Sequence, residues 1–323
     1  MTKVTWGVIG CSGFAHSRTI PAMQQAASVD LLAIASRTAQ RAHEFRDHFR
    51  IPRAYPSYEA LLADRDIQAV YIPLPNALHA EWTILAMQSG KHVLCEKPLT
   101  SNAAEAVRVA DAAAATGMKV MEAFMWRFHP QHERALDAVR SGEIGDPRLV
   151  RAGFTFMIER KPNVRLDHTL VGGSVMDVGC YPISGARYYF GAEPSMAVAR
   201  GGIDPEFGVD MNMGGLLEFA NGRALIDSGF HLPERTDIEI LGEKGSIRIP
   251  KAWVPDDGGA TIIVNGRQEE FGPCNHYVLE FERFSRSILD DSPPPFGQDD
   301  AVRQMRAVDA VRRSIRSGTP EVV

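Results

Sequence analysis

The sequence predicts an α/β domain with a parallel sheet, followed by an α+β domain with a largely antiparallel open sheet. In the first part of the 323-residue chain, short apolar runs alternate with helical stretches, as in a parallel sheet covered on both faces. Farther along, strand-like segments are separated by hairpin signals such as Asn221-Gly222 and Asn265-Gly266. We therefore expect domains at residues 1–124 and 125–323, with the last helix able to pack back on the first domain.

The expected first domain opens with a strand at residues 4–10, which is apolar and rich in β-forming residues. Further apolar runs predict strands at residues 31–36, 68–72, 91–95 and 119–123. Helices are expected between them at residues 15–25, 38–49, 77–89 and 101–116. The last of these helices is rich in alanine, the strongest helix former.

The expected second domain begins with a helix at residues 130–140, which Ser141-Gly142 ends. Strand character follows at residues 149–156, 211–219, 223–230, 237–241, 246–249 and 261–264. Two long helices accompany them at residues 174–190 and 276–289. A last amphipathic helix is expected at residues 299–316, after the stiff run Ser292-Pro-Pro-Pro.

Composition and charge narrow the class of protein. The chain has 40 acidic and 35 basic residues and a formal net charge of -5, which argues against a nucleic-acid surface. No apolar run is long enough to span a bilayer, and the strand-like start of the sequence leads us to expect no secretion signal. The four cysteines, Cys11, Cys95, Cys180 and Cys274, form no CxxC pair and indicate a reducing compartment. We expect a cytoplasmic protein that binds neither membrane nor nucleic acid.

The turn after the first strand is a candidate dinucleotide site of the Rossmann type. Gly10 and Ala15 fit the first and third positions of the G-x-G-x-x-G/A fingerprint. Ser12 occupies the second position, followed by Gly13 and Phe14, and it is small enough for the backbone to approach a pyrophosphate. The helix that follows would offer free N–H groups to that anion.

The end of the second strand indicates which dinucleotide binds. NAD-binding proteins place an acidic residue there to hold the ribose 2′-OH, but this chain has Ser36, Arg37 and Thr38. An arginine flanked by two hydroxyls suits a 2′-phosphate, so the pattern favours NADP over NAD. Alternatively, Arg37 is one more solvated surface charge, which leaves NAD open.

Candidate reaction residues lie in three segments. Lys97 follows Glu96 at the end of a strand, where a parallel sheet places its ligands. Asp177 and Tyr181 are spaced i, i+4, so a helix would present a carboxylate and a phenol on one face. Structural alternatives exist for each: a surface lysine, a carboxylate at a helix start and a core aromatic residue. Arg127 would face the cofactor or substrate, or else form an ion pair between domains.

Histidines could indicate a metal site, but here they do not. His129 and His132 are spaced i, i+3, and no further ligand cluster accompanies them. Because protein metal sites need three or four ligands, we expect no metal.

Taken together, these segments resemble the glucose–fructose oxidoreductase / inositol dehydrogenase (Gfo/Idh/MocA) family. The matching stretches are GVIGCSGFA, IASR, YIPLPNALHAEW, GKHVLCEKPLT, MEAFMWRFHPQ and GGSVMDVGCYPI. The last two are most similar to the subgroup of NADP-dependent xylose dehydrogenases, dihydrodiol dehydrogenases and sugar ketoreductases. Ser12 departs from the fingerprint, and many members have histidine where this chain has Tyr181.

The resemblance implies an NADP(H)-dependent oxidoreductase acting on a sugar-like or polyol-like substrate. It implies that Lys97 and Tyr181 handle the substrate proton, while Asp177 binds a substrate hydroxyl and orients Lys97. The residues that it implies around the cofactor or substrate, besides the glycine turn and Ser36-Arg37-Thr38, are Pro73, Asn76, His79, Glu96, Lys97 and Arg127.

Two other functions compete with this interpretation. A non-catalytic, dinucleotide-sensing regulator could share the fold, but it would not need Lys97, Asp177 and Tyr181 together. An NAD-dependent lyase related to glycosidases is a weaker alternative, because Tyr181 does not fit it. Since an uncovered sheet face is a liability, we also expect a homodimer or a dimer of dimers packed through the open sheet.

Overall fold

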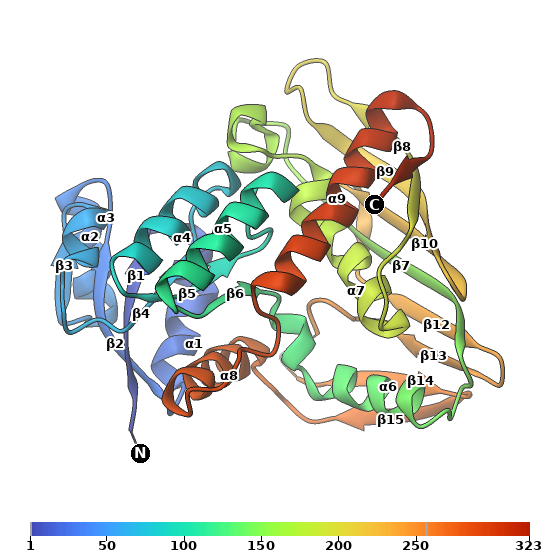
Figure 1. Ribbon diagram of the computed structural model, residues 1–323, viewed down its shortest axis with the longest axis horizontal. Coiled ribbons are helices and arrows are strands. Elements are labelled where there is room, and N and C mark those ends of the chain that lie inside the picture. Colours follow the sequence, from blue (N-terminus) through green and yellow to red (C-terminus); the bar gives the residue numbers. More distant parts are fainter. Residues whose placement is uncertain (1, 256–257) are drawn as a thin grey trace. The chain divides into compact units, whose positions relative to one another are not determined.

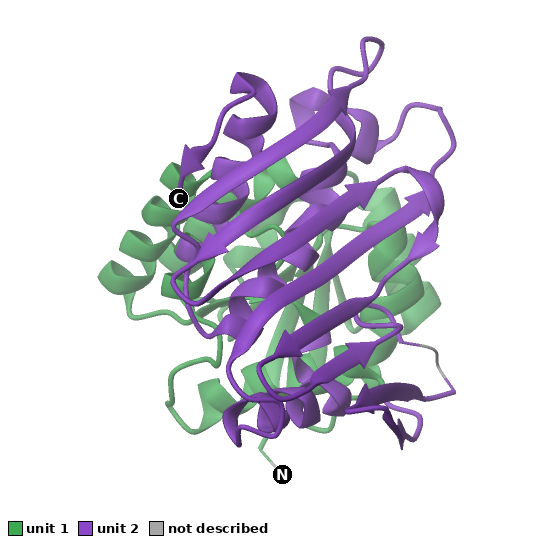
Figure 2. Cartoon of the chain, turned by 90° about the vertical axis from the view of Figure 1, so that its right-hand side faces the viewer, with its two compact units in different colours: residues 1–125, 275–302 green, residues 126–274, 303–323 purple. Residues whose placement is uncertain are grey.

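The computed structural model describes residues 2–255 and 258–323, and its chain divides into two compact units (Figures 1 and 2). Unit 1 comprises Met1–Met125 and Asn275–Val302, and unit 2 comprises Trp126–Cys274 and Arg303–Val323. The sequence predicted a different division. It placed all of residues 125–323 in the second domain, with only the last helix able to pack back on the first.

Aromatic packing explains why residues 275–302 group with unit 1. The indole of Trp6, on β1 (Val4–Ile9), is fully buried against the rings of Phe281 and Phe284 on α8 (His276–Leu289), with centroids 5.5 and 5.8 Å away. Its Nε1 donates a hydrogen bond to Ser285 Oγ at 3.2 Å. This contact joins two distant segments of sequence into one core.

Unit 1 is built on a six-stranded parallel sheet in the order β3-β2-β1-β4-β5-β6. The strands after β1 are β2 (Val29–Ala35), β3 (Arg53–Tyr55), β4 (Ala69–Ile72), β5 (His92–Glu96) and β6 (Val120–Ala123). The helices of the unit are α1 (Ile20–Gln25), α2 (Ala39–Phe49), α3 (Tyr58–Leu62), α4 (His79–Gln88), α5 (Ala103–Thr116) and α8. The strand order reverses between β1 and β4, and parallel sheets bind ligands at the carboxyl ends of the strands on either side of such a reversal.

Unit 2 is built on a ten-stranded sheet in the order β15-β14-β13-β12-β7-β10-β9-β8-β16, with β11 also paired to β7. Its strands are β7 (Pro147–Met157), β8 (Met196–Ile203), β9 (Asp210–Phe219), β10 (Gly222–Gly229), β11 (His231–Arg235), β12 (Ile238–Gly242), β13 (Ser246–Ile249), β14 (Ala260–Val264), β15 (Arg267–Phe271) and β16 (Glu321–Val322). Among the described strands of this sheet, β7 and β10 pair in parallel and the other pairs are antiparallel. The predicted fold class is confirmed for both units.

Two further helices accompany α6 (Pro130–Arg140) in unit 2. On α7 (Cys180–Phe190), Gly185 lies so close to Trp253 that a methyl group there would meet the indole at 2.6 Å. The last helix, α9 (Gln298–Ser317), crosses from one unit to the other in sequence, and its Gln304 donates to the Cys180 carbonyl at 2.9 Å. Figure 2 shows one face of the ten-stranded sheet turned to the viewer, and no described helix of unit 2 lies over that face.

Several elements were missing from the sequence analysis for physical reasons. Half of strand β8 is alanine and glycine, which carry little β propensity. Every residue of β11 is exposed and most of β15 is, so neither strand has an apolar side to detect. The short β3 and α3 were also missed.

Helices α1 and α7 each follow an irregular turn. This corrects the prediction of continuous helices at residues 15–25 and 174–190. A π-helical turn at Ala15–Thr19 precedes α1, and another at Val175–Gly179 precedes α7. Pro21 and Pro182 lie shortly after these turns and lack the N–H that a regular helix would donate four residues back.

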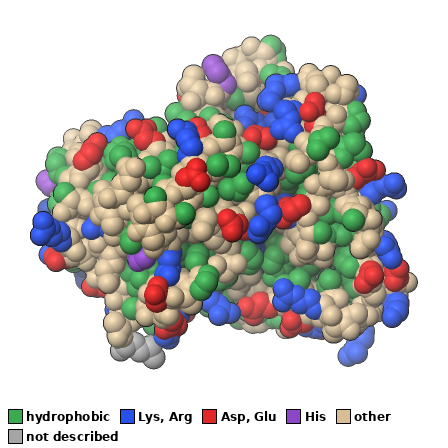
Figure 3. Space-filling view, in the orientation of Figure 1, with side chains coloured by type: hydrophobic (Ala, Val, Ile, Leu, Met, Phe, Trp, Pro, Cys, Tyr) green, Lys and Arg blue, Asp and Glu red, His purple; other side chains and the backbone are tan. Residues whose placement is uncertain are grey.

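The surface is polar and mixed in charge. On the face seen in Figure 3, Lys and Arg side chains are interspersed with Asp and Glu, without one continuous basic expanse. No helix among the described residues is long and apolar enough to cross a membrane.

Candidate active site

The glycine turn after β1 lies where the strand order reverses. Gly10 has a φ of +120°, and a Cβ there would meet the Leu74 side chain at 2.8 Å, so only glycine fits. Ser12 Oγ accepts the Ala15 N–H at 3.0 Å and thereby caps the first helical turn. At Gly13, by contrast, a Cβ would have no described atom within 4 Å. Protein packing therefore does not require glycine at position 13.

The end of β2 presents two arginines rather than the one that was predicted. Ser36 is buried, Arg37 is exposed, and Thr38 Oγ1 accepts the Arg41 N–H at 3.4 Å as the cap of α2. Arg41 lies in the first turn of that helix, and half of its side chain is exposed. The sequence contained a signal for Arg41 that we missed. When Thr38 caps the helix, the residue three positions later lies next to it, and that residue is Arg41.

The thiol of Cys11 locates Arg41 relative to the glycine turn. Burial raises the pKa of Cys11 to about 11, while a hydrogen bond from Ser36 and the charge of Arg41 act in the opposite direction. Arg41 is therefore near enough to act on the turn between β1 and α1. Arg37 acts instead on Tyr58, where its charge opposes the burial that raises the pKa of that phenol.

Buried polar groups hold the Glu96-Lys97-Pro98 turn from three sides. Tyr71, fully buried on β4, donates its hydroxyl proton to Glu96 Oε1 at 2.5 Å. Glu122, on β6, accepts the Leu99 N–H at 2.9 Å. His79 places Nδ1 2.8 Å from the Pro98 carbonyl. Each contact joins the turn to a different element, so the backbone on both sides of Lys97 is fixed.

His79 has a structural place within unit 1. Its side chain is 1% exposed, and its Nε2 lies 2.7 Å from the Leu74 carbonyl. Burial lowers the pKa of His79, and the two carbonyl acceptors oppose that shift. The ring thus ties the segment after β4, which holds buried Pro73 and partly buried Asn76, to the Lys97 turn.

In unit 2, two glycines and a buried aspartate set the start of the helical segment that carries Asp177. Gly173 has a φ of +111° and lies directly against the Asp210 carboxylate, and a methyl group at Gly172 would overlap the Arg165 carbonyl. Asp210 Oδ2 accepts the Ser174 hydroxyl and the Val175 N–H, each at 2.7 Å. Asp210, on β9, therefore caps the π turn that contains Asp177.

The side chains of Asp177 and Tyr181 face the same loop. Arg165 Nε donates to Asp177 Oδ2 at 2.7 Å, and Asp177 and Tyr181 both act electrostatically on Arg165, raising its pKa. Tyr181 is 4% exposed, and its ring packs edge-on against Phe154 with centroids 5.2 Å apart. The sequence analysis did not single out Arg165, Phe154 or Asp210.

Three other candidates have contacts of their own in unit 2. Arg127 is buried and donates from Nη2 to Ser184 Oγ on α7 at 2.6 Å. His129 Nδ1 accepts the Gln131 N–H, and burial lowers the pKa of His129 to about 4. His132 Nδ1 lies 2.7 Å from the Tyr189 hydroxyl. Over residues 2–255 and 258–323, no three His, Cys, Asp or Glu side chains gather closely enough to hold a metal.

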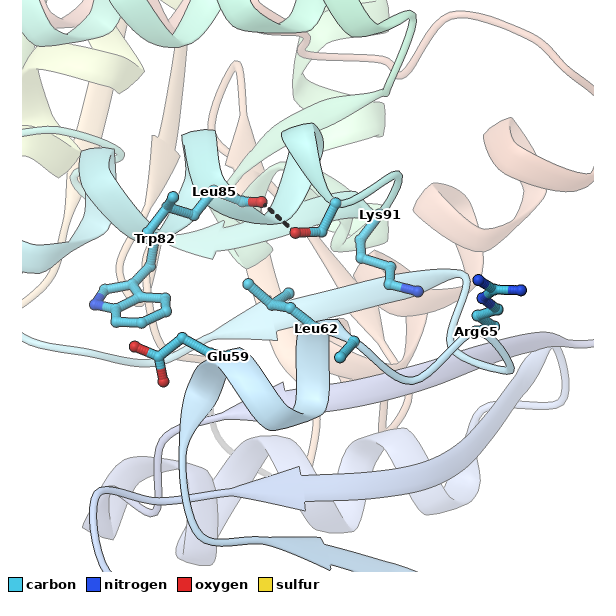
Figure 4. Close-up of a pocket in the computed structure, with 8 residues that line it drawn as sticks. Glu59, Leu62, Arg65, Trp82, Leu85 and Lys91 are labelled. Carbon is cyan, nitrogen blue, oxygen red and sulfur yellow. Dashed lines mark hydrogen bonds between the residues drawn. The ribbon is translucent and has the colours of Figure 1, made fainter.

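A hollow of about 410 Å³ in unit 1 lies away from these residues (Figure 4). Trp82, Leu62, Arg65 and Lys91 are among its lining residues, and the buried Lys91 ammonium donates to the Asp64 and Ile67 carbonyls. Arg65 and Lys91 precede β4 and β5, so they lie at the amino ends of these strands. Gly10, Ser36 and Lys97 follow the carboxyl ends, where parallel sheets bind ligands.

The parallel sheet, its strand order and the glycine turn at the reversal point define a dinucleotide-binding Rossmann domain. Residues 4–124 match the family model described as "Oxidoreductase family, NAD-binding Rossmann fold", and residues 132–248 match the "GFO/IDH/MocA C-terminal domain". The chain belongs to the Gfo/Idh/MocA family of oxidoreductases, which confirms the resemblance found in the sequence.

Relatives with named activities support an enzyme rather than a regulator. A D-xylose 1-dehydrogenase (NADP(+)) from Haloferax volcanii is 41% identical over 97% of this chain and 98% of that protein. A 3-ketoreductase from Actinomadura kijaniata, solved in complex with NADP and TDP-benzene, has a TM-score of 0.91 at 31% identity and covers 97% of this chain and 98% of its own. An aldose-aldose oxidoreductase from Caulobacter crescentus, complexed with glycerol, has a TM-score of 0.92 at 27% identity, with 99% and 100% covered.

The capping role of Asp210 can be tested by substitution. Asp210→Ala removes the acceptor of two buried donors, so we expect the free energy of unfolding to fall by roughly 1–3 kcal/mol. Asp210→Asn keeps an acceptor oxygen and should lose clearly less. Urea denaturation of both variants measures the difference. Equal losses in the two variants would show that the hydrogen bonds to Asp210 do not hold this helix start.

Proposed function

We propose that this protein is an NADP(H)-dependent oxidoreductase that transfers a hydride between nicotinamide and the carbinol or carbonyl carbon of a sugar, anhydrosugar or cyclic diol. The observation that carries the proposal is the glycine turn at the β1–β4 reversal with arginines, and no carboxylate, at the end of β2. The named activities of the relatives above support the same substrate class.

The residues of the turn fit a dinucleotide. The open space over Gly13 would let a pyrophosphate approach the backbone closely, at the start of the helical segment that follows Phe14. Ser36, Arg37 and Arg41 would hold the 2′-phosphate, with Arg37 on the Tyr58 side and Arg41 on the Cys11 side. Glu96, Pro73, Asn76 and Arg127 remain proposed cofactor residues.

The chemistry needs a group that takes the hydroxyl proton as the carbinol carbon gives up its hydride. When bound, NADP⁺ supplies the hydride acceptor. We assign the proton to Tyr181, with Lys97 and Asp177 as its partners. A free tyrosine has a pKa of about 10, too high for an efficient base near neutrality. An ammonium group such as that of Lys97 would favour the phenolate, and Asp177 would accept a substrate hydroxyl. In the reductive direction, Tyr181 returns the proton to the new alkoxide.

We also propose a cytoplasmic homo-oligomer, most simply a dimer, formed through the uncovered face of the unit 2 sheet. Leu225 on β10 is 44% exposed and pairs in register with Leu216 on β9. Beside them, Arg151 and Glu239 form an ion pair across β7 and β12. An apolar centre with a charged border is the composition of a protein interface.

Cofactor choice tests the two arginines. We expect wild-type protein to bind NADPH more tightly than NADH, and Arg37→Asp and Arg41→Ala each to weaken NADPH roughly 10- to 100-fold, because each loses a charge-assisted hydrogen bond. Fluorescence titration gives both dissociation constants. Arg46→Ala is the matched control, since Arg46 lies on the same helix in an ion pair with Asp47. If wild type binds both dinucleotides equally, neither arginine selects the cofactor.

Tyr181→Phe tests the proton-transfer role. This variant keeps the ring that packs on Phe154 but removes the hydroxyl, so kcat should fall roughly 10²- to 10⁴-fold. The dissociation constant for NADPH should stay within about twofold, because the hydroxyl is not assigned to cofactor binding. Steady-state kinetics with an aldose and NADP⁺, together with the titration, separate the two effects. Nearly full turnover would remove Tyr181 from the reaction.

A charge on the open sheet face tests the oligomer. Leu225→Glu would bury a carboxylate at the proposed interface, so light scattering after gel filtration should report monomer where wild type gives dimer or tetramer. Leu85→Glu makes the same change at an exposed position on α4 of unit 1 and should leave the mass unchanged. A wild type that is monomeric at micromolar concentration contradicts the proposal.

A further inference from the structure

Arg165 uses only part of its hydrogen-bonding capacity. Its Nε donates to Asp177 at 2.7 Å, and 45% of its side chain is exposed. Neither of its terminal amino groups donates a hydrogen bond to any residue in the described ranges 2–255 and 258–323, and Asp177 is the one carboxylate there that ion-pairs with the side chain. An arginine held by Nε presents the end of its guanidinium, a planar pair of N–H donors, to whatever lies beyond.

The backbone around Arg165 is anchored, so the guanidinium does not hang from a free loop. The Arg165 carbonyl accepts the Gly173 N–H at 2.9 Å. The next residue, Leu166, is 2% exposed within an apolar cluster that includes Val178 and Phe230. Together with the bond to Asp177, these contacts hold the guanidinium before any ligand arrives, which reduces the entropy lost on binding.

Arg160, in the same loop, shows the opposite arrangement. Its two terminal amino groups are engaged by carboxylates, with Nη1 donating to Asp204 at 2.6 Å and Nη2 to Glu206 at 2.9 Å. Its exposure, 52%, is similar to that of Arg165. The two arginines therefore differ in whether their terminal donors are already occupied, and only Arg165 neighbours Asp177 and Tyr181.

We propose that Arg165 binds an oxyanion of the substrate through its two terminal amino groups and so selects acidic sugars over neutral ones. The inference rests on the proposed function and narrows its substrate class. A carboxylate or a phosphoryl group matches the paired donors of a guanidinium. The half-buried rings of Phe154 and Phe156, on the strand that precedes the loop, would line the apolar side of the sugar near Tyr181. The acidic group would then be directed to Arg165 while the reacting hydroxyl meets Tyr181.

The test compares two acidic sugars with a neutral one. NADPH formation is followed at saturating NADP⁺ with D-glucuronate, D-glucose 6-phosphate and D-glucose, which share the hydroxyl at C1 and differ at C6. Wild type should show the higher kcat/KM for one of the two acids, and that acid identifies the anion as carboxylate or phosphoryl. Arg165→Gln should lower the acid-to-neutral ratio about tenfold or more, and Arg165→Lys, which keeps the charge without the fork, should lower it less. Arg160→Gln is the matched control and should leave the ratio within about twofold.

Two outcomes would overturn the assignment. The first is a wild type that prefers glucose to both acids. The second is an Arg165→Gln variant that slows all three sugars in equal proportion, which would leave Arg165 only as the residue that holds Asp177. Calorimetric titration of the two acids into the protein separates this inference from the proposed function. If an acid binds to wild type and not to Arg165→Gln, yet no sugar is turned over with NADP⁺, the anion site stands and the proposed function fails.

Discussion

Two close backbone approaches, at Gly10 and Gly173, are the constraint on which both halves of the candidate site depend. Each glycine has a positive φ and lies against another element, Gly10 against Leu74 and Gly173 against Asp210. A side chain at either position would strain the backbone, and at Gly173 it would also collide with the Asp210 carboxylate. The local chain direction after β1, and again before α7, therefore follows from the absence of a Cβ.

Buried polar groups then supply the precision that apolar packing cannot. Dispersion and burial are non-directional, whereas a buried hydrogen bond fixes two atoms, because leaving either one unpaired is costly. Tyr71, His79 and Glu122 each form one such hydrogen bond with the turn around Lys97. These three buried side chains come from different elements of unit 1, and together they hold the turn that carries a single lysine.

The sequence was sufficient for the fold class because periodicity is a local signal. Apolar runs separated by helices indicated the parallel sheet, and hairpin turns indicated the antiparallel one. The roles of Lys97, Asp177 and Tyr181 stay predictions that rest on motif and spacing. Asp210 and Arg165 could not be found in this way, because tertiary packing brings them to Asp177. The prolines at positions 21 and 182 did contain the signal for the π turns.

Arginine is common around the candidate site, and its role at each position depends on how many of its donors are already occupied. Arg160 donates hydrogen bonds to two carboxylates. Arg127, which is buried, donates to a serine, and Arg165 donates through Nε to one carboxylate. The same residue type therefore ties loops together, supports a helix, or remains available to a ligand. Composition cannot distinguish these cases, because all of them add the same charge. The distinction arises from the geometry of partners, and for that reason the residue that selects a substrate can lie in a loop with no recognisable motif.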